Sequence, residues 1–94
     1  MPNRRQARAD VNSALAAALT RLRGRASLTQ SEVARRMGTT QTAIARLESG
    51  AQNPTIKTVQ DYVRATGFSL RIQFVRPADP AELTADLLLA EDDP

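Results

Sequence analysis

The sequence predicts a small, mainly α-helical domain of four to five helices, followed by one β-strand. Apolar residues recur at helical spacing between residues 10 and 67, in four segments that polar caps and glycines separate. After Gly67 the apolar period changes from about 3.6 to 2, which is typical of a half-buried strand. With 94 residues and 41% hydrophobic content, the chain is expected to form one domain with a thin core.

The first helix is expected over residues 10–23, after a flexible, Arg-rich arm at residues 1–9. Gly24 and the polar residues that follow it end this helix. The apolar positions on its buried face are Val11, Leu15, Ala18, Leu19 and Leu22.

Two short helices joined by a glycine turn are predicted next. Thr29 and Glu32 match a capping box, in which the hydroxyl and the carboxylate each accept an amide proton at the start of a helix. That helix is expected over residues 30–37, and Gly38 supplies the left-handed residue that ends it. Thr40 caps a third helix, which runs to about residue 48.

A fourth helix is expected from Thr55 or Ile56 to Ala65. Its buried residues are predicted to be Ile56, Val59, Tyr62 and Val63. A strand follows at residues 68–76, and the acidic tail at residues 77–94 begins with chain-breaking prolines. Within the tail, residues 81–89 are predicted as a short helix with Leu83, Leu87 and Leu88 on one side.

Charge is distributed unevenly along the chain. All 13 Lys and Arg residues precede residue 77, whereas residues 77–94 contain six of the 10 acidic residues and no base. A basic body favours an anionic partner, and a solvated surface with a disordered tail is the alternative.

Composition excludes several kinds of site. The chain has no cysteine and no histidine, which removes disulfides, thiolate metal sites, Ser-His and Cys-His pairs and most zinc chemistry. Because no nucleophile–base pair, ligand cluster or phosphate loop is found, no enzyme, catalytic residue, metal or cofactor is expected. No apolar run approaches the roughly 20 residues of a membrane span, so a cytoplasmic binding module without a membrane partner is expected.

The segment LTQSEVARRMGTTQTAIARLESG, from Leu28 to Gly50, resembles the helix-turn-helix of the XRE (Cro/C1-type) family of phage and bacterial repressors. Asn53-Pro54-Thr55 and residues 62–67 resemble the fourth helix of that family, so the resemblance covers about residues 14–67. It implies a lambda-repressor-like bundle in which residues 10–67 bind double-stranded DNA.

The motif indicates which side chains contact bases. A recognition helix in the major groove presents its first-turn side chains to base edges. Gln41 can pair bidentately with adenine, and Arg46 can reach a guanine or a phosphate. A purely capping role for Thr40 is the alternative at that position. The expected base-contacting residues are Thr40, Gln41, Thr42, Ala45 and Arg46.

Phosphate contacts and one structural ion pair complete the expected site. The expected phosphate-contacting residues are Gln30, Thr39, Asn53, Thr55 and Lys57. The resemblance implies that Gln30 clamps a phosphate, and a solvated surface lysine is the alternative for Lys57. Arg23 and Glu48 occupy positions that form a salt bridge between the first and third helices in many family members, so they are assigned to structure.

The strand suggests a dimer. No second strand is evident in the sequence, and an unpaired strand edge is a liability, so the strand is expected to pair with a second copy about a two-fold axis. Such a homodimer would place two recognition helices about 34–36 Å apart on a palindromic operator. The expected interface residues are Phe68, Leu70, Ile72 and Phe74.

The helix-turn-helix followed by GFSLRIQFV is similar to the HigA and HipB groups of antitoxins. Those proteins repress their own operon and bind a toxin encoded beside them. The resemblance therefore implies an antitoxin of a toxin-antitoxin system, in which the tail or the N-terminal arm binds a cognate toxin such as a ribonuclease. A stand-alone XRE transcriptional regulator, with a tail that only solvates the protein, is the alternative.

Overall fold

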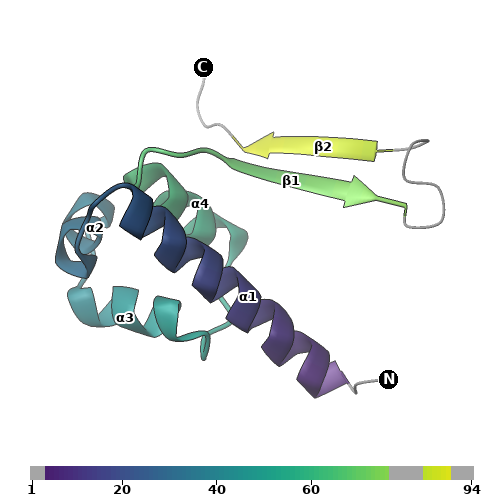
Figure 1. The fold of residues 1–94 in the computed structure, drawn as a ribbon, viewed down its shortest axis with the longest axis horizontal. Coiled ribbons are helices and arrows are strands. Elements are labelled where there is room, and N and C mark those ends of the chain that lie inside the picture. Colours follow the sequence, from purple (N-terminus) through teal and green to yellow (C-terminus); the bar gives the residue numbers. More distant parts are fainter. Residues whose placement is uncertain (1–3, 77–83, 90–94) are drawn as a thin grey trace.

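The computed structural model describes residues 4–76 and 84–89. Four helices and two strands succeed one another along this part of the chain (Figure 1). They are α1 (Arg4–Arg25), α2 (Gln30–Met37), α3 (Gln41–Ser49), α4 (Ile56–Ala65), β1 (Leu70–Val75) and β2 (Thr84–Leu89).

Caps determine the ends of α2 and α3. The Thr29 hydroxyl accepts the Glu32 N–H at 3.0 Å, and the Glu32 carboxylate accepts the Thr29 N–H at 2.7 Å, so the predicted capping box is present. The hydrogen bond from the Thr29 amide lowers the pKa of Glu32. Gly38 and Gly50 end α2 and α3 at φ values of 71° and 80°. The predicted bounds of α2 are confirmed, and those of α3 are correct within one residue.

The core lies where the four helices meet. Its most completely buried large side chains are Leu19, Val33, Ile44 and Tyr62. Two predictions about burial are wrong, because Val11 is 65% exposed and Ile56 is 58% exposed. Val11 precedes Ala16, the first buried residue of α1, and Ile56 is the first residue of α4, ahead of the residues of that helix that are buried.

α1 begins at Arg4, so the backbone of residues 4–9 is helical rather than the expected flexible arm. Arg, Gln and Ala are strong helix formers, and no Gly or Pro interrupts this segment. Residues 1–3 lie outside the described part of the chain. Over 4–76 and 84–89, the structure contains no helix with the length and apolarity needed to cross a membrane.

β1 and β2 form an antiparallel sheet within the chain, with a register from Leu70↔Leu89 to Val75↔Thr84. The predicted helix is therefore wrong for residues 84–89, and the expectation that the chain lacks a second strand is also wrong. The leucines at 87–89 fit either a helix or a strand, and pairing with apolar β1 decides between them. The prediction for residues 77–83 and 90–94 lies outside the described residues. The sheet starts beside α4 and extends beyond the bundle (Figure 1), and Leu70 packs against the core.

Candidate nucleic-acid interface

α2 and α3 pack against each other across the turn at residues 38–40, in a helix-turn-helix arrangement. The Thr40 hydroxyl accepts the Ala43 N–H at 3.1 Å and so caps α3. A hydroxyl that accepts in this way keeps its own proton to donate, so capping and DNA contact are compatible. Gln41, Thr42 and Arg46 are exposed and Ala45 is half-buried, so α3 presents a polar first turn to solvent.

Two predicted DNA contacts, Gln30 and Gln41, are brought together by the packing of α2 against α3. The side-chain amide of Gln41 donates through Nε2 to Oε1 of Gln30 at 2.6 Å. Gln30 in turn donates through Nε2 to Oε1 of Glu48 at 3.0 Å. A chain of hydrogen bonds therefore connects the exposed start of α3 to a carboxylate near its C-terminal end.

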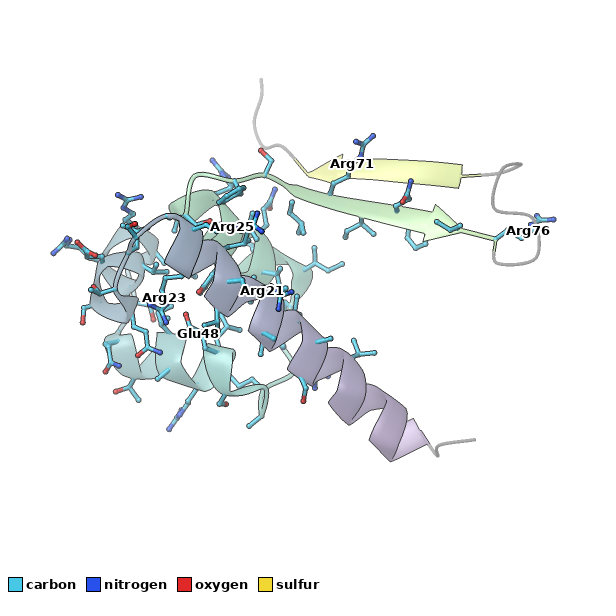
Figure 2. The ribbon with its side chains drawn as sticks, viewed as in Figure 1. Arg21, Arg23, Arg25, Glu48, Arg71 and Arg76 are labelled. Carbon is cyan, nitrogen blue, oxygen red and sulfur yellow. The ribbon has the colours of Figure 1, made fainter. Side chains whose placement is uncertain are left out.

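Glu48 is the centre of this network. Arg23 on α1 faces Glu48 on α3 (Figure 2), and its Nε and Nη2 donate to the two carboxylate oxygens at 2.7 and 2.9 Å. The Tyr62 hydroxyl lies 2.5 Å from Oε2. Burial raises the pKa of Glu48, but the hydrogen bonds from Arg23, Gln30 and Tyr62 outweigh burial and lower the pKa overall. Glu48 is therefore ionised at neutral pH.

The partners of Glu48 are held by further contacts. The hydrogen bond to Glu48 raises the pKa of Arg23, whose Nη1 also donates to the Leu28 carbonyl oxygen at 3.0 Å. Burial, and then the hydrogen bond to the carboxylate, raise the pKa of Tyr62, so its phenol stays protonated. The predicted Arg23–Glu48 ion pair is confirmed. The part played by Tyr62 was not predicted, although a tyrosine on a buried helix face requires a hydrogen-bond partner.

Three of the predicted phosphate contacts, Thr39, Asn53 and Thr55, line one hollow of about 480 Å³ between α3 and the start of α4. Thr55 caps α4, because its hydroxyl accepts the Thr58 N–H at 3.1 Å. The N-terminus of α4 adds the positive end of a helix dipole to this hollow. Gln30 lies apart from the hollow, beside Gln41.

Lys57 already has a partner on its own helix. Its ammonium is 3.2 Å from Oδ2 of Asp61, one turn further along α4, and the Lys57 side chain is 80% exposed. Exposed pairs at this spacing contribute only about 0.3–0.5 kcal/mol. A phosphate could therefore displace the carboxylate at little cost.

Comparison with known proteins identifies the family. Residues 19–73, more than half of the chain, match the helix-turn-helix family HTH_3. The chain is also 36% identical over 70 residues to a protein of Sinorhizobium fredii described as the uncharacterized HTH-type transcriptional regulator y4dJ, across 74% of this chain and 90% of that protein. No solved structure matches the chain. The chain belongs to the helix-turn-helix family of the XRE type, whose members are DNA-binding transcriptional regulators.

Proposed function

We propose that the chain is a sequence-specific repressor that binds a palindromic operator as a dimer, with the start of α3 in the major groove. The observation that carries the proposal is the hydrogen-bonded series Gln41–Gln30–Glu48. This series holds the exposed amide of Gln41 beside the half-buried amide of Gln30, at the N-termini of α3 and α2.

Each amide keeps the groups that DNA recognition requires. Nε2 of Gln41 has two protons and donates one to Gln30, so the second proton and Oε1 remain for bidentate pairing with adenine. Nε2 of Gln30 likewise donates one proton to Glu48 and keeps one for a phosphate oxygen. DNA binding would thus extend the hydrogen bonds of the free protein without breaking them.

The other expected DNA contacts are compatible with an orientation in which the start of α3 lies in the major groove. Thr39, Asn53 and Thr55 share the hollow beside the N-terminus of α4, where a phosphate can meet several donors at once. Thr42, Ala45 and Arg46 follow Gln41 along α3. A second copy doubles these contacts on the operator, because a single domain of this size forms only a small DNA interface.

The antitoxin role stays a prediction, and a stand-alone regulator fits the fold and the family equally well. Coexpression with the product of the adjacent gene distinguishes the two roles. A stable complex that tightens or releases operator binding would favour the antitoxin, and no complex would favour the stand-alone regulator.

Anisotropy titrations with a duplex selected from a random pool, and with a scrambled duplex, test the repressor proposal. Gln41→Ala should weaken binding to the selected duplex by about 1–3 kcal/mol per half-site and leave the scrambled duplex nearly unaffected. Lys57→Ala is the control. It should weaken both duplexes alike and reduce the salt dependence of log K by about 0.9. An equal loss on both duplexes for Gln41→Ala would remove it from the base-reading residues, and amide resonances at 40–46 that do not respond to DNA would contradict the proposal.

A further inference from the structure

We infer that Glu48 selects adenine over guanine at the base pair that Gln41 contacts, because it fixes the direction in which the side-chain amides of Gln30 and Gln41 point. The inference rests on the repressor proposed above and names a positioning residue for its base recognition. It uses the hydrogen-bonded series Gln41–Gln30–Glu48, whose direction is decided at the carboxylate.

The ionised carboxylate of Glu48 accepts hydrogen bonds and has no proton to donate. Its Oε1 accepts from Nε2 of Gln30 at 3.0 Å and from Nη2 of Arg23 at 2.9 Å. Its Oε2 accepts from Nε of Arg23 at 2.7 Å and from the Tyr62 hydroxyl at 2.5 Å. These donors occupy both oxygens of a side chain that is only 6% exposed. Gln30 therefore cannot turn its own acceptor oxygen toward Glu48.

The direction of the first amide determines that of the second. With Nε2 of Gln30 turned to the carboxylate, Oε1 of Gln30 faces the start of α3, where Nε2 of Gln41 donates to it at 2.6 Å. A Gln41 amide flipped by 180° would place two carbonyl oxygens against each other and lose this hydrogen bond. The orientation of the exposed Gln41 amide is therefore set by Glu48, acting through Gln30.

This orientation leaves Gln41 with one N–H and its Oε1 for a base edge. In the major groove, adenine presents the acceptor N7 and the donor N6 amino group, whereas guanine presents two acceptors, N7 and O6. One N–H and one carbonyl oxygen therefore match adenine, and guanine would place its O6 against Oε1 of Gln41. If the series ran in the opposite direction, Oε1 would accept from Gln30 and two N–H groups would remain, which match guanine. The direction of the series thus decides between the two purines.

Selection of duplexes from a random pool by the full-length protein, followed by sequencing, tests the inference. Gln41→Ala identifies the relevant base pair, as the position at which the preference for adenine is lost. At that position the wild-type protein should favour adenine over guanine by about tenfold or more. Glu48→Gln should reduce this ratio by about threefold or more, because the introduced amide is able to donate to Oε1 of Gln30 and both directions of the series become possible.

Tyr62→Phe is the matched control, because it removes a donor from Oε2 of the same carboxylate and keeps the hydrogen bond between Oε1 and Gln30. It should destabilise the fold but leave the ratio of adenine to guanine unchanged. A loss of stability alone lowers the folded fraction and so weakens binding to all duplexes alike. An unchanged ratio for Glu48→Gln would therefore overturn the inference, and so would an equal fall of the ratio for Tyr62→Phe.

Gln30→Met provides a second variant, because it interrupts the series and keeps the Arg23–Glu48 ion pair. It should lower the ratio of adenine to guanine as Glu48→Gln does, since the Gln41 amide is then able to rotate. Addition of Glu48→Gln to Gln30→Met should leave the ratio unchanged, because Glu48 acts through Gln30. A Gln30→Met protein with the full preference for adenine would overturn the inference even if Glu48→Gln proved to be unfolded.

Side-chain amide resonances of the free protein separate this inference from the proposed function, because they do not depend on DNA. Glu48→Gln should shift the NH₂ signals of Gln41 as well as those of Gln30, and in Gln30→Met protein it should leave the Gln41 signals in place. Gln41 signals that do not respond to Glu48→Gln would overturn the inference and leave the repressor intact. A wild-type protein whose signals respond in this way but which selects no sequence would instead contradict the proposed function.

Discussion

The helical bundle and its two extensions, the N-terminal half of α1 and the sheet (Figure 1), differ in how completely their side chains are satisfied. Within the described chain, every buried side-chain nitrogen and oxygen of the bundle has a hydrogen-bond partner. The extensions, by contrast, expose Val11, Phe74 and Val75, the last of these at 47%. The comparison indicates that buried contacts in the bundle stabilise the fold, whereas the exposed apolar side chains of the extensions contribute little to it.

Truncation of an apolar side chain in each region should have the largest and most unequal effect. Leu19→Ala should lower the free energy of unfolding by about 3 kcal/mol, because Leu19 is 2% exposed and its loss leaves a cavity. Phe74→Ala should lower it by less than about 1 kcal/mol in the monomer. Urea denaturation at a concentration that keeps the chain monomeric measures both values, and equal losses would contradict the comparison.

The Arg23–Glu48 and Lys57–Asp61 ion pairs should differ in the same way. Glu48→Ala should lower the free energy of unfolding by about 2–3 kcal/mol, since it leaves Arg23 and Tyr62 without their shared acceptor. Asp61→Ala removes the exposed partner of Lys57 and should cost less than about 0.5 kcal/mol. Chemical denaturation of both variants checks the difference, and an equally small loss for Glu48→Ala would show that the network contributes little to stability.

The lowered pKa of Glu48 predicts how stability depends on pH. A carboxyl group whose pKa is lower in the folded than in the unfolded chain stabilises the fold above the unfolded value of 4.5, and this contribution is lost as the pH falls below it. The free energy of unfolding should therefore decrease on acidification from about pH 5. Glu48→Gln should flatten that decrease. Glu32→Gln is the control for the exposed capping box, whose carboxyl also has a lowered pKa.

Two glycines provide the smallest and sharpest comparison. Gly38 has a φ of 71°, so Gly38→Ala should destabilise the fold by about 1 kcal/mol through backbone strain alone. Gly24 lies within α1, and an added Cβ there would meet nothing within 4 Å. Gly24→Ala should therefore stabilise the fold by about 0.5–1 kcal/mol. Melting temperatures of the two variants should move in opposite directions, and a shift of the same sign would contradict this assignment.

Local signals accounted for most of the helical bundle. Thr29, Gly38 and Thr40 determine helix ends through contacts within a few residues. These helix ends can therefore be predicted from short segments of sequence. Val11 was assigned to the core because periodicity identifies the face of a helix but not how far the bundle extends along it. β2 was missed because its strand character depends on pairing with residues 9 to 19 positions earlier in the chain, from the Val75–Thr84 pair to the Leu70–Leu89 pair.

The site was predictable in its parts but not in its connections. The polar first turn of α3 and the Arg23–Glu48 pair were both expected from the sequence. The contact between Gln30 and Gln41 joins residues that are 11 positions apart, and the contact of Tyr62 with Glu48 joins residues 14 positions apart. Such contacts depend on how the helices pack, which no local pattern encodes.

Tyr62 also provides the protein with an intrinsic optical probe. It is the one tyrosine of a chain without tryptophan, so the tyrosine absorbance band and the tyrosine emission both originate from this phenol. Its hydroxyl shares the carboxylate that Gln30 contacts. Spectroscopy on the unlabelled protein can therefore follow a rearrangement at the start of α3 from the centre of the bundle, without any added dye.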